Sequence, residues 1–324
     1  MADLAVVIVT WNVRDLALNA LASLYADLNA HGPPADVYVV DNASSDGTAE
    51  AIRSAYPQVR LIASETNLGF GAGNNRALRE IGFGSLPATE LPRAVYLLNP
   101  DTITQPGATR TLFETLLADA DTGLAGARLT YQDGRFQHSA FRFPGLRQLW
   151  VEFFPTPGRL YESDFNGRYP RHLYESGQPF DIDFPLGATM MLRREVIEQT
   201  GGFDEQFFMY CEEIDWAWRI HKAGWRVRCV PSAHVIHLEG QSTGQVRPRS
   251  IINLWRSRLL LYHKHYPKWK TVLARWMVAL GTRHKVQQVR QNSSLSNADR
   301  QALVEAYDTV RTMALRGHKA DVAG

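Results

Sequence analysis

The first hundred residues alternate between short apolar runs and longer segments with helical periodicity. The apolar runs, rich in β-branched residues, cover positions 4–10, 37–41, 59–63 and 94–98, and such runs are typical of strands buried on both faces of a parallel sheet. Helical periodicity follows at 15–30 and 48–54, and the segment 67–75 opens a further helix. This β-α-β-α-β order with short connections predicts a doubly wound α/β domain with a mainly parallel sheet.

Polar side chains gather where the predicted strands end. Thr10 and Asn12 follow the first strand, Asp41 ends the second, and Asn99 and Asp101 follow the fourth. In sheets of this kind ligands bind beyond the carboxyl ends of the strands. Each residue also has a plain explanation in turn chemistry. Independent turns need not all use Asp or Asn at one edge, so the combination favours a binding site.

A glycine-rich run, Gly69-Phe-Gly-Ala-Gly73, raises the alternative of a dinucleotide cofactor. A dinucleotide fingerprint should follow the first strand and precede an acidic residue by about 20 positions. Here the run follows the third strand, and the first strand ends in Thr10-Trp-Asn12 without a glycine. The sequence therefore disfavours an oxidoreductase.

A cluster of carboxylates, Glu212, Glu213 and Asp215, follows the aromatic and sulfur side chains at 207–211. In a helix that starts near position 211, Asp215 can pair with Arg219 four residues later, which leaves Glu213 pointing elsewhere. A carboxylate beside two others and near an apolar wall has a raised pKa and can accept a proton from an alcohol. The alternative is an acidic helix N-terminus that complements the helix dipole.

The region 130–184 does not continue the βα alternation. Residues 131–136 are typical of a hairpin around Asp133-Gly134. The aromatic-rich loop beyond it is interpreted as a lid or acceptor wall, with plain packing as the alternative. Position 186–192 is a predicted strand with small residues, and strand-like segments at 227–230 and 233–237 place His237 on the opposite face from His234.

The composition predicts a globular chain whose 324 residues and 45% apolar content suffice for one large domain or a domain with an appendage. Two cysteines without metal-type spacing predict a reduced, cytoplasmic chain. The N-terminal apolar run is of strand length and lacks a basic region before it, and no stretch reaches transmembrane length.

The C-terminal region is strongly basic although the net charge is only +2. Between Gly240 and Ala298 there are eleven Lys and Arg residues and no Asp or Glu. Such asymmetry predicts an anionic partner, and the aromatics mixed with the cations favour a membrane surface. Nucleic acid is disfavoured, because nothing upstream resembles a nucleic-acid module. A homo-oligomer interface or a helix packed on the main domain is the remaining interpretation.

The ordered set of motifs resembles family 2 inverting glycosyltransferases, and most of all the bacterial rhamnosyltransferase group. The motifs lie between positions 4 and 243, and they comprise segments 6–12, 41–47, 67–75, 98–101, 187–188, 201–204 and 209–215. The resemblance implies a GT-A fold, with a nucleotide-sugar-binding half at 1–129, an acceptor and catalytic half at 130–239, and a helical region at 240–324.

The same resemblance implies roles for individual residues. Asp41 accepts the imide N–H of a uracil or thymine base, and the rest of the nucleotide-binding set is Thr10, Asn12, Asn67, Gly73 and Asn99. Asp101 is the metal-binding carboxylate for Mg²⁺ or Mn²⁺, in a motif whose first Asp is replaced here by Asn99, and His237 is a second metal or diphosphate ligand. Glu213 is the catalytic base where relatives have Asp, with Glu212 and Asp215 as alternatives.

The function implied is metal-dependent, inverting transfer of a sugar in cell-envelope glycan synthesis. The donor expected is dTDP-rhamnose or another UDP- or dTDP-sugar, and the acceptor is lipid-linked or a polysaccharide. The enzyme is expected in the cytoplasm, peripherally associated with the membrane through 240–298. Two alternatives remain. A sugar nucleotidyltransferase should carry a Gly-rich pyrophosphate loop after the first strand, and a non-catalytic sugar-nucleotide-binding protein should show no turnover.

Overall fold

A computed structural model describes residues 2–238 and 247–316. Contacts between residues divide the chain into two compact units. The first, here called the sheet unit, comprises Met1–Arg142, Tyr169–Gln206 and Glu212–Ser242, and the second, the helical unit, comprises Phe143–Arg168, Phe207–Cys211 and Thr243–Gly324. The helical region expected from the sequence alone at 240–324 is thus joined by two segments from the middle of the chain.

The sheet unit contains all the described strands. In chain order these are β1 (Leu4–Thr10), β2 (Ala35–Asp41), β3 (Arg60–Ala63), β4 (Ala94–Leu98), β5 (Thr102–Thr104), β6 (Thr122–Thr130), β7 (Phe136–Gln137), β8 (Ala140–Phe141), β9 (Phe180–Asp181), β10 (Phe184–Pro185), β11 (Thr189–Arg193) and β12 (Arg226–His237). Its α-helices are α1 (Arg14–His31), α2 (Thr48–Ala55), α3 (Phe70–Ile81), α4 (Ala108–Ala118), α6 (Arg171–Glu175), α7 (Arg194–Thr200) and α8 (Glu212–Lys222). A 3₁₀ helix, η1 (Ala88–Glu90), precedes β4.

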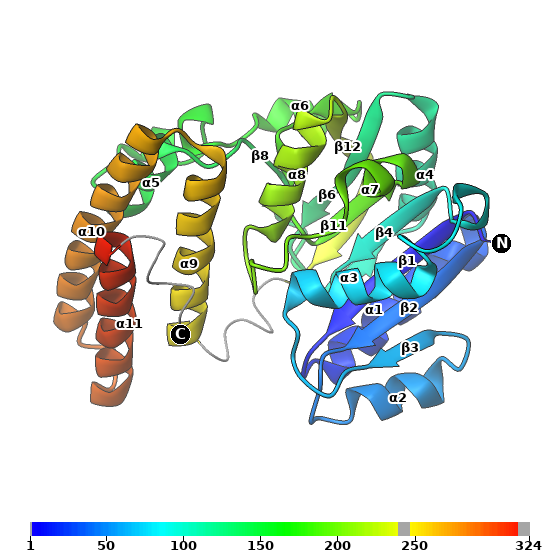
Figure 1. The fold of residues 1–324 in the computed structure, drawn as a ribbon, viewed down its shortest axis with the longest axis horizontal. Helices are drawn as coiled ribbons and strands as arrows, with labels where there is room; N and C mark the ends of the chain where they lie inside the picture. The colour runs from blue at the N-terminus through cyan, green and yellow to red at the C-terminus, as the bar shows by residue number, and fades with distance from the viewer. Residues whose placement is uncertain (1, 239–246, 317–324) are drawn as a thin grey trace. The chain divides into compact units, whose positions relative to one another are not determined.

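The main sheet has the order β3-β2-β1-β4-β11-β6-β12-β5, with β7 paired to β6 and β9 to β12. The pairs among β1 to β4 and the pair β6–β12 are parallel, whereas β11 and β5 run antiparallel to their neighbours. Helix α1 packs against α2 and α4, and Figure 1 draws α3 and α7 in front of the sheet. The prediction of an α/β fold with a mainly parallel sheet is confirmed.

The element bounds match the apolar pattern closely in the first half of the chain. Strands β1 and β4 have the predicted bounds, because their residues are buried on both faces. Two predictions in the second half needed correction. The strand expected at 186–192 begins only at Thr189. The two segments expected at 227–230 and 233–237 form one strand, β12, whose register with β6 shifts between Val230 and His234.

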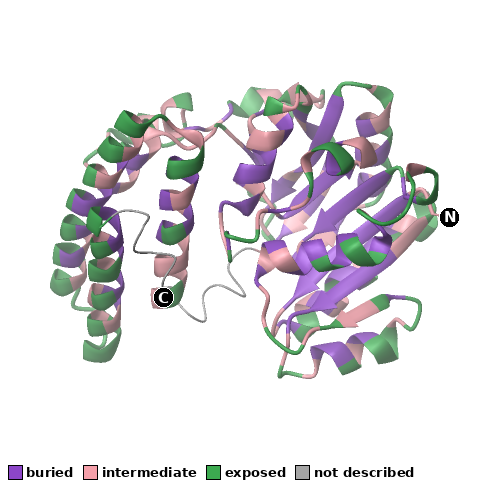
Figure 2. Cartoon of the chain, in the orientation of Figure 1, coloured by how far each residue is buried: buried purple, intermediate pink, exposed green. Residues whose placement is uncertain are grey.

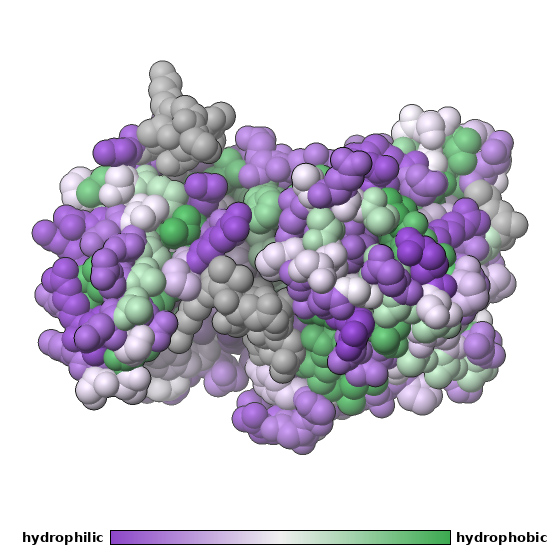
Figure 3. Space-filling view, turned by 90° about the horizontal axis from the view of Figure 1, so that it is seen from below, coloured by the Kyte–Doolittle hydropathy of each residue, from purple (hydrophilic) through white to green (hydrophobic). Residues whose placement is uncertain are grey.

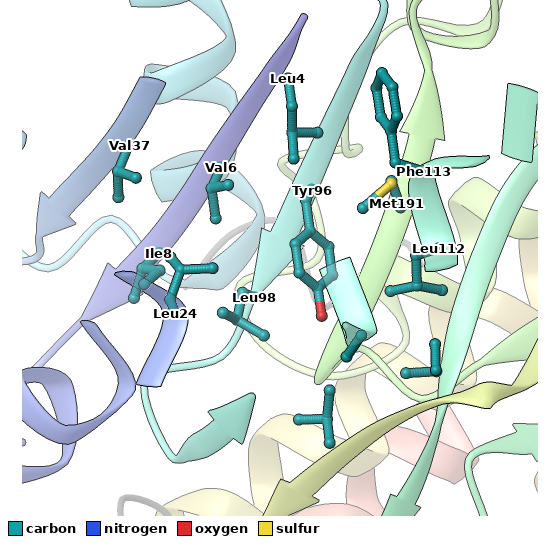
Figure 4. Close-up of a cluster of buried hydrophobic side chains, with 14 of the residues drawn as sticks. Leu4, Val6, Ile8, Leu24, Val37, Tyr96, Leu98, Leu112, Phe113 and Met191 are labelled. Atoms are coloured by element: carbon teal, nitrogen blue, oxygen red, sulfur yellow. The ribbon is translucent and has the colours of Figure 1, made fainter. Parts of the chain in front are cut away.

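The core of the sheet unit lies between the sheet and its covering helices. Val6, Ile8 and Tyr96 are fully buried, and Figure 4 shows them beside Leu24, from α1, and Leu98. Figure 2 shows the central strands as almost continuously buried. Burial raises the pKa of the Tyr96 hydroxyl, so that this side chain stays neutral.

The helical unit has a separate core. Its elements are α5 (Leu146–Phe153), η2 (Gly158–Leu160), η3 (Asp164–Asn166), α9 (Arg247–His265), α10 (Lys268–Gln291) and α11 (Asn297–Arg316). The Phe153 ring stacks on that of Trp255 at 4.9 Å between centroids, and Arg258 pairs with Glu152 beside them. A Cβ at Gly281 would lie 2.1 Å from Phe153 Cγ. Only glycine therefore lets α5 approach α10 this closely.

The surface of the chain mixes hydrophilic and hydrophobic side chains, as Figure 3 shows for one face. Among the described residues, no helix combines the length and apolar content needed to cross a membrane.

Candidate active site

The ends of β1 and β2 are joined through the Asp41 carboxylate. Thr10 Oγ1 donates to Asp41 Oδ1 at 3.1 Å, and the Ser44 backbone N–H donates to Asp41 Oδ2 at 3.1 Å. Thr10 and Asp41 are both buried. The turn interpretation of Asp41 is therefore correct as a statement of local structure. It does not exclude binding, because each carboxylate oxygen can accept a second hydrogen bond.

Asn12 holds the turn that follows β2. Its backbone is left-handed, with φ of 52°, a conformation that Asn adopts more readily than most residues. Its N–H donates to Ser44 Oγ at 2.9 Å, and its Oδ1 accepts from the Ser45 N–H at 2.7 Å. Asn12 thus fixes the shape of the loop around Asp41.

The glycine-rich segment is ordered by local bonds and close packing. Asn67 Oδ1 accepts the Gly69 N–H at 2.9 Å, and Asn42 Nδ2 donates to the Gly69 carbonyl at 3.0 Å. A Cβ at Gly73 would lie 2.9 Å from Val9 Cγ1. Gly73 and Asn67 therefore bring the start of α3 against the ends of β1 and β2. Sequence reasoning did not single out Asn42 in this arrangement.

The end of β4 is tied to two neighbouring strands. The Asn99 N–H donates to the Ala188 carbonyl at 3.0 Å, just before β11, and the Leu238 N–H donates to the Asp101 carbonyl at 2.8 Å, just after β12. Position 99–101 thus lies where the ends of β4 and β12 meet the start of β11. The sequence predicted the strand end but not its partners.

Asp101 and His237 form a buried pair at this edge. His237 Nε2 lies 3.4 Å from Asp101 Oδ1, and Asp101 Oδ1 has no hydrogen-bond partner among the described residues. The other ring nitrogen of His237, Nδ1, lies 3.1 Å from Gln137 Nε2, and with this amide turned over its oxygen would accept the Nδ1–H and leave His237 Nε2 free to bind a cation. Because both side chains are almost fully buried, a carboxylate oxygen without a donor is costly unless a cation meets it.

The pair fits a divalent cation. Ligands that each lie about 2.0–2.2 Å from one ion are separated by roughly 3 Å, and oxygen is the ligand that Mg²⁺ prefers. The described residues contain no group of three or more His, Cys, Asp and Glu side chains placed for a metal. An ion held by Asp101 and His237 would take its other ligands from water and from a phosphate-bearing substrate, as Mg²⁺ commonly does.

An open cleft of about 430 Å³ borders this pair. Its lining combines the hairpin residues and the end of β12, namely Tyr131, Gln132, Asp133, Arg135, His237 and Leu238. The predicted hairpin is confirmed. The Tyr131 N–H donates to the Arg135 carbonyl at 2.8 Å, and Gly134 adopts φ of 81°. The cleft gives a substrate access to His237.

The three carboxylates of α8 have different surroundings. Asp215 is fully buried and pairs with Arg219 at 2.9 Å, which also donates to the Gly202 carbonyl at 2.7 Å. The predicted pair is confirmed, and it ties α8 to the loop 201–204. Glu212 is buried. Glu213 is the partly exposed carboxylate of the three.

Glu213 reaches the same edge of the sheet as Asp101. A Cβ built on Gly187 would lie 3.7 to 3.9 Å from the Glu213 side chain, including Cδ of its carboxyl group. The next residue, Ala188, is bonded to Asn99 as described above. Gly187 therefore lies close to the Glu213 side chain and, through Ala188, next to the strand end that carries Asp101.

Burial separates the pKa values of the two neighbouring glutamates. Desolvation raises the pKa of Glu213 to about 7. It raises the pKa of Glu212 well above its ordinary value, and repulsion from Glu213 adds to the rise. Near neutral pH, Glu213 therefore exchanges a proton readily, as a general base requires.

The loop 201–204 is anchored to α3 by Asn75, which sequence reasoning missed. Asn75 Nδ2 donates to the Phe203 carbonyl at 2.9 Å, and Asn75 Oδ1 accepts the Phe203 N–H at 2.8 Å. A Cβ at Gly202 would lie 2.2 Å from Asn75 Oδ1. This two-way bond links the nucleotide-side helix α3 to the loop before α8.

The comparison of the sequence with known families decides the class of protein. The family described as glycosyltransferase like family 2 matches residues 2–251. The chain belongs to glycosyltransferase family 2. The resemblance on which the site residues were chosen is thereby confirmed as a family relationship, and the protein is a glycosyltransferase.

The relatives of this glycosyltransferase include two named rhamnosyltransferases. The N-acetylglucosaminyl-diphospho-decaprenol L-rhamnosyltransferase of Mycobacterium tuberculosis is 30% identical over 280 residues, which are 84% of this chain and 88% of that protein. Rhamnosyltransferase WbbL of Escherichia coli is 26% identical over 227 residues, which are 67% of this chain and 78% of that protein.

A solved structure has a similar fold. The mannosyltransferase PcManGT from Pyrobaculum calidifontis, in complex with GDP-Man and Mn2+, matches at a TM-score of 0.54 and 19% identity, covering 97% of this chain and 84% of that one. At this identity the likeness shows the fold alone, and it agrees with the GT-A fold expected of the glycosyltransferase.

Proposed function

We propose that this glycosyltransferase moves L-rhamnose from dTDP-rhamnose onto a lipid-linked or polysaccharide acceptor of the cell envelope, with inversion at the anomeric carbon. The names of the two rhamnosyltransferase relatives support the donor sugar, and the decaprenol-linked name supports a lipid-linked acceptor. Another UDP- or dTDP-sugar is the second candidate, since Asp41 would accept the imide N–H of either base.

The observation that carries the proposal is the meeting of three groups at one edge of the sheet. Asp41 ends β2, Asp101 and His237 form a buried pair 3.4 Å apart, and Glu213 lies over Gly187 beside the end of β4. The positions of Asp41 and Asp101 in the first part of the chain, and of Glu213 in the second, support a donor half at 1–129 and an acceptor half at 130–239. Gly187 has no side chain, so a sugar can approach between the base and the diphosphate side of the site.

The proposed reaction uses Glu213 as the base. The acceptor hydroxyl attacks the anomeric carbon while Glu213 takes its proton, the bond from that carbon to the diphosphate breaks, and the nucleoside diphosphate leaves. Attack from the face opposite the leaving group inverts the configuration. Holding the hydroxyl and the donor in this geometry lowers the entropic part of the barrier.

Asp101 and His237 act on the departing diphosphate. When bound by them, Mg²⁺ or Mn²⁺ would neutralise the negative charge that develops on the leaving group. Asn99, two residues before Asp101, has a side-chain oxygen that is buried without a hydrogen-bond partner among the described residues. We assign it to the nucleotide-binding set with Thr10 and Asn12.

A screen of nucleotide sugars tests the proposed donor. The intact protein is incubated with dTDP-rhamnose, dTDP-glucose, UDP-glucose or GDP-mannose, with and without Mn²⁺, and its melting temperature is measured. A donor bound tightly through the metal raises stability by mass action, so dTDP-rhamnose with Mn²⁺ should give the largest shift. An equal or larger shift with GDP-mannose would contradict both the proposed thymine or uracil nucleobase and the proposed donor sugar.

Substitution of Asp41 tests the nucleobase pocket. Asp41→Ala is expected to weaken binding of dTDP and UDP by roughly 1–3 kcal/mol, because the base N–H loses its buried acceptor. Asp36→Ala is the control, since Asp36 is a carboxylate near the start of the same strand that pairs with Arg60 at the surface. Binding is measured by calorimetric titration. Equal affinity of Asp41→Ala and the wild type for dTDP and UDP would show that Asp41 only stabilises the turn after β2.

The pH dependence of transfer tests the state of Glu213. A base must be ionised, and the pKa of Glu213 is raised to about 7, so kcat/KM should fall about tenfold per pH unit below pH 7 and level off above it. Donor binding is measured at each pH as a control. A flat profile of kcat/KM between pH 5.5 and 8 would contradict Glu213 as the titrating base.

The place of action follows from the acceptor. We propose that the enzyme works in the cytoplasm at the inner face of the plasma membrane, where a lipid-linked acceptor is presented. The cation excess between Gly240 and Ala298 supports attraction to anionic lipids.

A further inference from the structure

Helix α10 of the helical unit has two different apolar faces. The inner face is buried and made mostly of small residues, namely Ala274, Val278, Ala279, Gly281, Thr282 and Val286. The outer face carries a stripe of large apolar side chains that are 45–66% exposed, namely Trp269, Val272, Leu273, Trp276 and Leu280. Their spacing of three and four residues places them on one side of the helix. This set is called the outer stripe below.

The outer stripe is not needed to hold the helical unit together. Helix α10 packs on α5 through its inner face, where Gly281 meets Phe153. Trp255 and Tyr262, two of the aromatics that the sequence grouped with the basic tail, are buried in this core. The structure thus divides the tail aromatics into a core set on α9 and an exposed set on α10. A contiguous exposed apolar surface of this kind marks an interaction site.

The charges around the outer stripe select its partner. Helix α10 carries six Lys and Arg residues and no Asp or Glu. Helical spacing puts Lys268 at one border of the stripe and Arg283 one turn beyond Leu280, and both residues are exposed. Lys270 and Arg275 also flank the stripe, but Lys270 lies over the Tyr266 ring and Arg275 donates to the Met313 carbonyl. Long cationic side chains at the border of an apolar face reach outward to anionic groups while their stems stay in apolar surroundings.

These features fit a lipid surface better than a second copy of the chain. A symmetric dimer through α10 would oppose two helices that carry only positive charge, which is unfavourable. Tryptophan, by contrast, is enriched at the membrane–water interface, where its ring is buried and its N–H remains hydrated. We propose that the outer stripe of α10 lies in the interface of an anionic bilayer with its cations on lipid headgroups. The inference rests on the proposed function, because a lipid-linked acceptor brings the reaction to that surface.

Vesicle binding tests the inference with the full-length protein. Flotation is measured with phosphatidylcholine vesicles that contain one quarter phosphatidylglycerol, and with pure phosphatidylcholine. The wild type should bind the anionic vesicles, and raising the salt should weaken this binding. The double variant Trp269→Ser/Trp276→Ser should bind these vesicles at least about 10-fold more weakly than the wild type, because the apolar part of the interaction is lost. Leu86→Ser, at an exposed leucine of the sheet unit, is the control and should bind as the wild type does.

The outcomes separate this inference from the proposed function. Transfer to a short, water-soluble acceptor should be the same in the wild type and the double variant, since the stripe lies outside the catalytic residues. If the double variant binds vesicles like the wild type, the stripe is not the docking surface, whatever the transfer assay shows. If the wild type ignores anionic vesicles at low salt but is a dimer that the double variant converts to a monomer, the stripe binds a second copy and the inference is wrong.

Discussion

Glu213→Gln is expected to lower sugar transfer by roughly 10²–10⁴-fold while leaving donor binding intact. Glutamine keeps the size of the side chain over Gly187 and its hydrogen bonding, but it cannot take the proton of the acceptor hydroxyl. The effect should appear in kcat, measured with saturating dTDP-rhamnose and acceptor. Affinity for dTDP, measured by calorimetry, serves as the control.

The neighbouring carboxylates supply matched controls. Glu212 is buried whereas Glu213 is partly exposed, so an acceptor can reach Glu213 more easily, and Glu212→Gln should leave much of the transfer rate. Asp215→Asn weakens the pair with Arg219 at 2.9 Å, so it should lower the melting temperature together with the rate. If Glu213→Gln transfers nearly normally while Glu212→Gln is inactive at unchanged stability, the base has been assigned to the wrong glutamate.

Glu213→Asp tests the length of the base. Relatives of the chain are expected to have Asp at this position, which is one methylene shorter. If the position of α8 compensates for the longer side chain, Asp will be displaced from the acceptor hydroxyl and transfer will fall. Near-normal transfer by Glu213→Asp would show that the extra methylene has no role in the reaction.

Stability gives a second signature of the same residue. The folded-state pKa of Glu213 is raised from 4.5 to about 7, so the folded protein holds this proton more tightly than the unfolded chain. The stability that protonated Glu213 contributes is complete below about pH 4.5 and is lost as the pH rises towards 7. Glu213→Gln should therefore be more stable than the wild type at pH 8, and the difference should disappear near pH 4.

The first half of the fold was predictable because strands β1, β2 and β4 bury most of their residues on both faces. An apolar, β-branched run such as Leu4–Thr10 is typical of a strand buried inside a parallel sheet. The predicted bounds of this strand agree with those in the structure. Asp41 and Asp101 were chosen as candidate site residues for a related reason. They follow such strands, and the carboxyl ends of parallel strands meet at one edge.

The partners of the site residues were not predictable from local pattern. Gln137 lies 100 positions from His237, and Asn75 lies 128 positions from Phe203. No periodicity relates residues so far apart, and single Gln and Asn residues are common on surfaces. What makes them important is the meeting of β7 with β6 and of α3 with the loop 201–204, which only the folded chain shows.

The sequence shows that the C-terminal region is basic and rich in aromatic residues, but it did not show which of these aromatics are buried. The sequence grouped aromatic residues of two helices as one interfacial surface. In the structure, Trp255 is 2% exposed whereas Trp269 is 66% exposed. Both lie in helices with cations and without acids, so amphipathic pattern alone could not separate them. The packing of α5 against α9 and α10 decides which aromatics are core.

Asp101→Ala is expected to abolish metal-dependent donor binding and to lower transfer by more than about 10²-fold, since the diphosphate loses its cation. Asp101 Oδ1 is buried 3.4 Å from His237 Nε2, and the described residues contain no cluster of three or more His, Cys, Asp and Glu side chains that could hold the ion instead. Binding of dTDP is titrated with and without Mn²⁺, and only the Mn²⁺-dependent part should disappear.

Two further variants test whether Asp101 and His237 hold the Mn²⁺ ion together. His237→Ala removes the second ligand and should weaken Mn²⁺-dependent binding of dTDP. Gln137→Leu keeps both ligands but removes the group 3.1 Å from His237 Nδ1, and loss of such a partner typically costs 10–100-fold in metal affinity. Asp133→Ala is the matched control, because Asp133 is an exposed carboxylate on the same cleft that pairs with Arg135. Full transfer by Asp101→Ala, or by the wild type in EDTA, would rule out a metal-assisted departure of the diphosphate and leave His237 to act on it directly.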